Sequence, residues 1–71
     1  MTPIGLYLAK KSVNKAMVSR KTGLSQARLS ELGSNEKTHL RAKELYLIAL
    51  AIDVDPCEVL REVYGDVSLN G

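Results

Sequence analysis

The sequence contains few aromatic residues, with three Tyr and neither Trp nor Phe among its 71 residues. A hydrophobic core must therefore be built from Leu, Ile, Val, Ala and Met. Cys57 is the only cysteine, which excludes an internal disulfide. With His39 as the only histidine, the chain lacks the four ligands of a usual zinc site. We therefore expect neither a metal nor another cofactor.

Long apolar segments are also missing. The run from Ile4 to Ala9 is too short for the apolar region of a signal peptide, and Lys10 and Lys11 follow it instead of preceding it. No stretch approaches the length needed to span a bilayer. Hydrophobic residues make up 45% and charged residues 25% of the chain, as in an ordinary globular protein. These features predict one small cytoplasmic domain with no membrane partner.

Basic and acidic residues are unevenly distributed. Residues 1–43 carry nine Lys or Arg and two Glu, a net charge of +7. Residues 44–71 carry one Arg and six acidic residues, a net charge of −5. This asymmetry suggests that one side faces a polyanion such as nucleic acid. Two solvated faces of opposite sign would give the same pattern, so charge alone leaves both interpretations open.

Apolar spacing and capping residues predict five helices. The expected boundaries are Thr2 as N-cap and Pro3 at the start of the first helix, Ser12 or Asn14 to Thr22 for the second, Ser25 to about Leu32 for the third, Arg41 to Ile52 for the fourth, and Asp55 to Gly65 for the fifth. Val59, Leu60 and Val63 are expected to form the apolar stripe of the last helix. Val67 and Leu69 alternate as a short strand would, within a tail of undetermined structure. The sequence thus predicts an all-α domain over residues 1–66 and a short tail over residues 67–71.

The segment from Lys15 to Ser34 has the pattern of a helix-turn-helix, in which two helices cross steeply over a short turn. The residues that carry this pattern are Val18 and the small Ser19 in the first helix, Gly23 and Leu24 in the turn, and Leu29 and Leu32 in the second helix. These positions resemble the phage-repressor-like (Xre/Cro) family, and the resemblance extends to the segment Leu45–Leu60. It implies a compact, lambda-repressor-like five-helix fold.

Helical angles identify the exposed face of the helix that follows Ser25. At about 100° per residue, Ala27 points outward while Ser30 and Glu31 lie beside it, and Gln26 and Arg28 flank this face. Their side chains suit the major groove: Gln26 can bind adenine, Arg28 guanine or a phosphate, Ala27 the thymine methyl group, and Glu31 the cytosine amino group. Glu31 can instead pair with Arg28. A solvated helix face is the alternative interpretation.

The resemblance implies further contacts with DNA. The family usually reads bases from the positions of Gln26, Ala27 and Glu31. The expected phosphate contacts are Lys15, where the family usually has Gln, together with Ser25, Asn35, Lys37 and Arg41. Arg41 can also enter the adjacent minor groove.

The predicted fourth helix contains eight consecutive apolar residues, Leu45–Ile52, which is unusual for a surface helix. One stripe belongs to the core, whereas Leu47 and Leu50 point to the opposite side and form an apolar patch with Val54. The tail residues Val67 and Leu69 or a second copy of the chain must cover this patch. We favour a homodimer, since twofold pairing suits a palindromic operator.

Together these patterns predict a sequence-specific DNA-binding transcriptional regulator, with repressor as the favoured role. One version is the antitoxin of a toxin–antitoxin pair, which would add a toxin protein as a partner. The alternative is a protein-interaction module of the same fold that no longer binds DNA. An enzyme is not expected, because His39 and Cys57 are the only conventional nucleophile or base candidates besides carboxylates.

Overall fold

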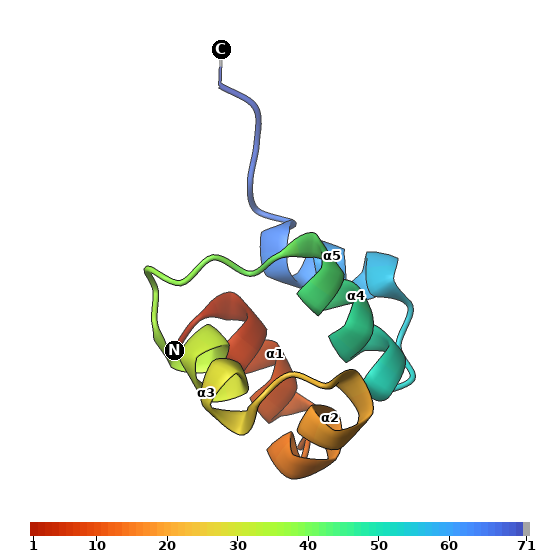
Figure 1. The fold of residues 1–71 in the computed structure, drawn as a ribbon. Coiled ribbons are helices and arrows are strands. Elements are labelled where there is room, and N and C mark those ends of the chain that lie inside the picture. The colour runs from red at the N-terminus through yellow and green to blue at the C-terminus, as the bar shows by residue number, and fades with distance from the viewer. Residues whose placement is uncertain (71) are drawn as a thin grey trace.

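The computed structural model describes residues 1–70. Their regular structure consists of the helices α1 (Pro3–Lys10), α2 (Lys15–Thr22), α3 (Gln26–Ser34), α4 (Ala42–Ala51) and α5 (Pro56–Tyr64), shown in Figure 1. No strand occurs among these residues, so the predicted all-α fold with five helices is confirmed. Within this part of the chain, none of the helices is long and apolar enough to cross a membrane.

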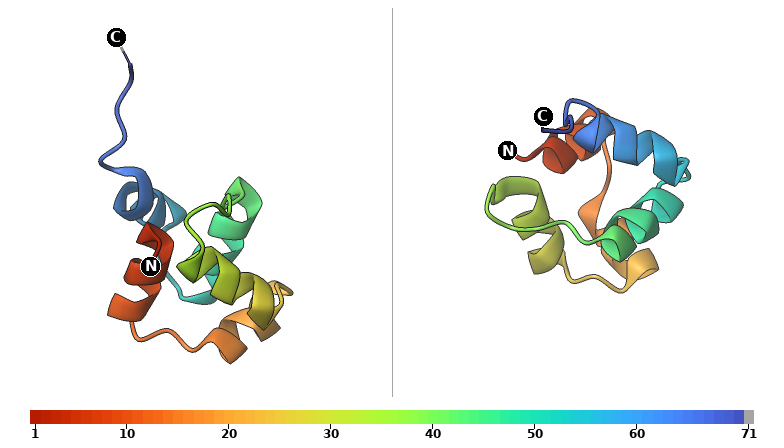
Figure 2. Two further views of the ribbon diagram at one scale, coloured as in Figure 1. Left: turned by 90° about the vertical axis from the view of Figure 1, so that its left-hand side faces the viewer. Right: turned by 90° about the horizontal axis from the view of Figure 1, so that it is seen from above.

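The helices pack so that the first and the last helix of the chain meet. α1 contacts both α3 and α5, while α4 lies between α2 and α5. Figure 2 shows α1 and α5 beside each other, although most of the sequence separates them. The Tyr7 hydroxyl in α1 donates a hydrogen bond to Glu58 Oε2 in α5 at 3.0 Å. This contact closes the domain between its first and last helices.

The core has two parts that share α4. The first part joins α1, α4 and α5 through Ile4, Tyr7, Leu45, Ala49, Val59 and Val63. The second joins α2, α3 and α4 through Val18, Leu29, Leu32, Ile48 and Ala51. The predicted apolar stripe of α5 is wrong at Leu60, which is 49% exposed. Val59 and Val63 are one helical turn apart and point into the core, and Leu60 lies about 100° around the helix from Val59.

The predicted N-caps Thr2, Ser25 and Asp55 are confirmed, and of the two candidates Ser12 and Asn14 for the second helix the structure has Asn14. The side chains of Thr2, Asn14, Ser25 and Asp55 each accept a hydrogen bond from a backbone N–H in the first turn of their helix. Gly23 ends α2 with φ +81°, in the left-handed region that favours glycine. Local sequence therefore determines where these helices begin and where α2 ends.

α3 continues two residues beyond the predicted end, through Gly33 and Ser34. The cause is Thr2, whose hydroxyl donates to Leu32 O at 2.6 Å and whose backbone N–H donates to Gly33 O at 3.0 Å. These bonds satisfy carbonyl groups that a helix end otherwise leaves without partners. The same hydroxyl accepts the Gly5 N–H at 3.1 Å, so Thr2 caps the start of α1 and the end of α3 together.

The backbones of α1 and α3 touch at two glycines. A Cβ atom placed on Gly5 would collide with the carbonyl group of Gly33. Only glycine at position 5 therefore permits this helix crossing.

After Gly65 the chain leads away from the helices (Figure 1). Val67 is 70% exposed and Leu69 is 97% exposed, and no strand forms over residues 67–70. The tail therefore does not cover the predicted patch on α4. The predicted tail also includes Gly71, which lies outside the described residues.

Candidate nucleic-acid interface

α3 presents one polar face to solvent. Gly23, Leu24 and Ser25 connect it to α2, and the half-buried Leu24 packs against the second part of the core. Leu29 and Leu32 hold the opposite face of α3 inside the domain. The exposed residues on the outer face are Gln26, Ala27, Glu31 and Ser34. None of these side chains is bulky, so backbone and side chains of α3 can approach a ligand closely.

One flank of α3 is held by the first turn of α2. Lys15 Nζ donates to Ser30 Oγ at 3.2 Å, and Ser30 is half-buried. The ammonium group therefore lies beside the outer face of α3 while supporting one of its side chains.

The other flank is held by the first turn of α4. Arg28 Nε donates to Glu44 Oε2 at 2.7 Å, and Arg28 Nη2 donates to Glu44 Oε1 at 2.9 Å. This is the paired geometry in which arginine binds a carboxylate most strongly. The same guanidinium donates from Nη1 to Glu31 Oε1 at 2.8 Å and from Nη2 to the His39 carbonyl at 3.1 Å. One side chain thus joins α3, α4 and the loop between them.

The charges in this network stabilise one another. Glu44 is only 6% exposed, and its Oε1 also accepts the Arg41 N–H at 3.0 Å. The hydrogen bonds from Arg28 lower the pKa of Glu44, outweighing the effect of burial, and the Arg41 N–H adds to the lowering. The bonds to Glu44 in turn raise the pKa of Arg28, with a smaller contribution from Glu31. Arg28 and Glu44 are therefore both charged at neutral pH.

The predicted base-reading residues fall into two groups. Gln26, Ala27 and Glu31 are exposed on the outer face of α3, whereas Arg28 and Ser30 are half-buried on its flanks. The predicted alternative for Glu31, pairing with Arg28, is confirmed by their 2.8 Å ion pair. The guanidinium of Arg28 faces protein acceptors, so reading guanine would require it to leave Glu44.

Sequence reasoning missed Glu44. Its position at the third residue of α4, after the N-cap Arg41, is a typical place for a capping glutamate and is visible in the sequence. Its partner Arg28 is 16 residues away. That pairing depends on how the packed fold places the start of α4 within reach of the Arg28 side chain, and no local sequence pattern predicts this placement.

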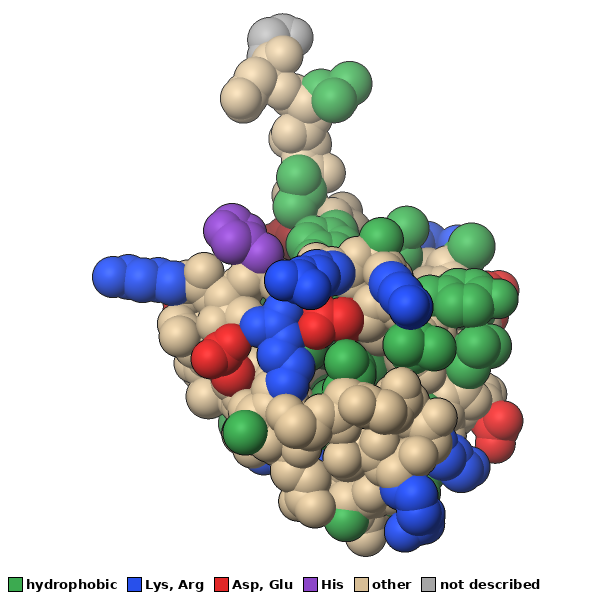
Figure 3. All heavy atoms as spheres, viewed as in Figure 1, with side chains coloured by type: hydrophobic (Ala, Val, Ile, Leu, Met, Phe, Trp, Pro, Cys, Tyr) green, Lys and Arg blue, Asp and Glu red, His purple; other side chains and the backbone are tan. Residues whose placement is uncertain are grey.

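Exposed cations surround the outer face of α3. Figure 3 shows basic and acidic side chains together in the middle of this view of the molecule. Lys15 lies at the start of α2, and Lys37 and Arg41 lie in the segment between α3 and α4. Within residues 1–70, no ion pair of 4.0 Å or less engages these three cations.

The remaining predicted phosphate contacts shape the backbone locally. Ser25 Oγ accepts the Arg28 N–H at 3.0 Å and so caps α3. Asn35 Oδ1 accepts the Lys37 N–H at 3.0 Å, which stabilises the turn that follows α3. Both residues are exposed beside the ends of α3.

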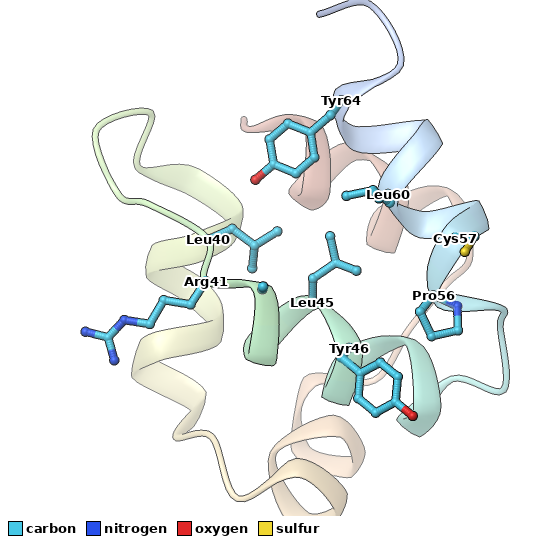
Figure 4. Close-up of a pocket in the computed structure, with 9 residues that line it drawn as sticks. Leu40, Arg41, Leu45, Tyr46, Pro56, Cys57, Leu60 and Tyr64 are labelled. Carbon is cyan, nitrogen blue, oxygen red and sulfur yellow. The ribbon is translucent and has the colours of Figure 1, made fainter.

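A separate apolar surface lies on α4 and α5. Of the predicted patch, Leu50 is 51% exposed, while Leu47 and Val54 are half-buried. Beside it lies a groove of about 310 Å³, which we call the α4–α5 groove. Its lining residues include Leu40, Leu45, Tyr46, Pro56, Leu60 and Tyr64. Figure 4 shows Leu40, Leu45 and Leu60 converging there while the side chain of Arg41 points away.

Two helices that meet at a left-handed glycine turn, with the second helix exposed among cations, define a helix-turn-helix domain. A family model for Cro/C1-type HTH DNA-binding domains matches residues 4–63. The chain belongs to this family and is a DNA-binding regulator, which confirms the predicted phage-repressor-like resemblance. No curated protein and no solved structure gives a significant match.

Proposed function

We propose that the protein is a sequence-specific repressor that inserts α3 into the major groove of its operator. The observation that carries this proposal is the exposed row of Gln26, Ala27 and Glu31 on a helix that is held on both flanks by polar contacts. Gln26 can bind an adenine edge, Ala27 can contact a thymine methyl group, and Glu31 can accept from a cytosine amino group. Arg28 and Ser30 support this surface through their protein partners.

The backbone of the operator is bound on both sides of α3. Lys15 binds phosphate at one flank, and Lys37 and Arg41 bind it at the other. Ser25 and Asn35 lie at the two ends of α3, where backbone N–H groups and the asparagine amide can approach phosphate. These contacts fix the register of the protein on DNA without reading sequence.

The repressor acts as a homodimer in which a second copy covers Leu50 and the adjoining α4–α5 groove. This surface lies on α4 and α5 rather than on α3, so pairing leaves both recognition helices exposed. The exposed Tyr46, Leu60 and Tyr64 add apolar surface to that of Leu50 and the half-buried Leu47 and Val54. Twofold symmetry then matches the protein to a palindromic operator with half-sites about one helical turn apart.

Selection of bound duplexes from a random library tests the proposal. We expect one preferred palindromic site, with affinity that falls steeply as salt increases. Lys37→Ala should reduce the slope of log affinity against log salt by about 0.9 if Lys37 neutralises one phosphate.

Lys21→Ala is the matched control, because Lys21 lines a hollow together with Asp53 and Val54, which follow α4, and no residue of α3 lines that hollow. Its salt slope should equal that of the unchanged protein. If the library yields no preferred duplex, the proposal is wrong and the protein-interaction module becomes the better interpretation.

A further inference from the structure

We propose that Arg28 is a positioning residue that holds the Glu31 carboxylate as a cytosine-specific acceptor, with Glu44 as its anchor. The inference rests on the proposed function and adds a specificity-determining relay to it: Glu44 orients Arg28, and Arg28 orients Glu31.

The first step is that Arg28 stays on Glu44 when DNA binds. Glu44 is 6% exposed and receives two bonds from the guanidinium, at 2.7 and 2.9 Å. If Arg28 moved to a phosphate, the Arg41 N–H at 3.0 Å would be the remaining partner of this buried carboxylate. A buried charge that loses its counter-charge is strongly destabilising, so the guanidinium remains in place.

The second step is that the anchored guanidinium fixes Glu31. Arg28 Nη1 donates to Glu31 Oε1 at 2.8 Å, and the two residues are one turn apart on α3. The Glu31 side chain is 50% exposed on the outer face of the helix. A carboxylate has two acceptor oxygens, so Oε2 stays able to accept while Oε1 is held. The Glu31 side chain therefore has one fixed orientation before DNA binds, instead of exchanging among several rotamers.

The net charge of Arg28, Glu31 and Glu44 determines which base Glu31 prefers. One guanidinium is shared by two carboxylates, so Arg28, Glu31 and Glu44 together carry a charge of −1. This charge repels acceptors and requires a donor from the DNA. In the major groove cytosine offers a donor, whereas guanine offers acceptors, thymine offers an acceptor and a methyl group, and adenine combines a donor with an acceptor. The arrangement therefore favours cytosine opposite Glu31.

The network also connects base reading with backbone binding. Arg28 Nη2 donates to the His39 carbonyl at 3.1 Å, in the segment that carries Lys37 and Arg41. Loss of the guanidinium would release the orientation of Glu31 and remove this one hydrogen bond, while Lys37 and Arg41 keep their charges beside α3.

The test measures base preference at each operator position, relative to the unchanged protein, for Glu31→Gln, Arg28→Lys and their combination. Glu31→Gln should reduce the preference for cytosine at one operator position by about tenfold to hundredfold. Arg28→Lys should lose the preference at the same position, because one ammonium cannot hold two carboxylates in the arginine fork. The double variant should lose little more than either single variant, since both act on one contact. The adenine preference assigned to Gln26 should persist in all three.

A folded variant without the guanidinium separates positioning from direct contact. Arg28→Met combined with Glu44→Gln leaves no unpaired buried charge and keeps an acceptor for the Arg41 N–H. If Arg28 acts only by orienting Glu31, this variant should lose the cytosine preference and keep the slope of log affinity against log salt. A slope lower by about 0.9 would show that Arg28 itself binds phosphate and would overturn the inference.

Two failures are distinguishable. If the unchanged protein selects no duplex, the proposed function is wrong, and the inference falls with it. If it selects a clear site, yet the Glu31 and Arg28 variants change no cytosine position or change different positions, only the relay is overturned.

Discussion

Glu44 combines two stabilising roles in one side chain. It caps the start of α4 by accepting the Arg41 N–H at 3.0 Å, and it binds Arg28 across the boundary with α3. A charged group with both kinds of partner is more strongly coupled to pH than an exposed surface pair, because water screens it less.

We predict that acid weakens the fold through Glu44. Its pKa is lowered in the folded state, so the unfolded chain binds this proton more readily. The stabilisation is therefore fully present above the unfolded pKa of about 4.3 and is lost as pH falls through the lower folded pKa. Glu44→Gln should reduce the free energy of unfolding by about 1.5–3 kcal/mol at pH 7.

Urea unfolding at pH 7 and at lower pH values checks this prediction. The difference in the free energy of unfolding between Glu44→Gln and the unchanged protein should shrink as the solution becomes acidic. Glu62→Gln, at an exposed position of α5, is the control and should leave the pH dependence nearly unchanged. A constant difference across the acid range would contradict the role assigned to the Glu44 charge.

Tyr7 gives the opposite pH dependence. Burial raises its pKa, and the hydrogen bond and charge of Glu58 raise it further, with a contribution from Glu62. The stabilisation is present below the unfolded pKa of about 10 and is lost as pH rises through the folded value. Tyr7→Phe should reduce the free energy of unfolding by about 1 kcal/mol at neutral pH. Tyr7→Phe should also lose less stability than the unchanged protein as the pH rises, measured by urea unfolding between about pH 8 and 11. Tyr46→Phe, at a 54% exposed site, is the control and should lose stability as the unchanged protein does.

At the scale of helices, the crossing of α1 and α3 is the most sensitive contact. Alanine normally favours a helix over glycine by about 1 kcal/mol. At Gly5 we predict the reverse, because a Cβ atom would collide with the Gly33 carbonyl and push the helices apart. Gly5→Ala should destabilise the domain by roughly 1–3 kcal/mol in urea unfolding.

Ser34→Ala is the control on the exposed face of α3, and it should change stability by less than about 0.5 kcal/mol. If Gly5→Ala instead stabilises the protein, the helices can separate at little cost, and the close crossing has no energetic importance.

The helices also show how far sequence predicts this fold. Caps act within a few residues, so Thr2, Ser25 and Asp55 could be recognised from local sequence alone, whereas for α2 the sequence left Ser12 or Asn14 open. The end of α3 was missed because its carbonyl partners belong to Thr2, which is 30 residues from Leu32. The exposed row on α3 followed from helical angles, whereas the anchor at Glu44 required the packed structure.

For the molecule as a whole, we predict that Leu50 lies in the dimer interface. Leu50→Lys places a charge in this apolar contact and should yield a monomer in sedimentation experiments. Binding to a palindrome should weaken, while binding to an isolated half-site should persist, because α3 is unaffected. Leu69→Lys, at a 97% exposed tail residue, should keep the dimer mass. An unchanged mass for Leu50→Lys would place the interface elsewhere.

Periodicity could not predict the full extent of this apolar surface. Leu60 fits an inward stripe in the sequence, yet it lines the α4–α5 groove together with Tyr46 and Tyr64. Which residues of a helix are buried depends on where its neighbours lie around it, and α1 and α4 leave Leu60 of α5 about half exposed.

The bond between Tyr7 and Glu58 has a genetic consequence. Because α1 packs against α5 as well as against α3, a chain that stops before residue 56 leaves Ile4 and Tyr7 without Val59 and Val63. Such a product retains the whole helix-turn-helix but lacks part of the core, and incompletely packed chains are readily degraded. Early stop codons before residue 56 should therefore cause loss of function, even though the helix-turn-helix segment itself is intact.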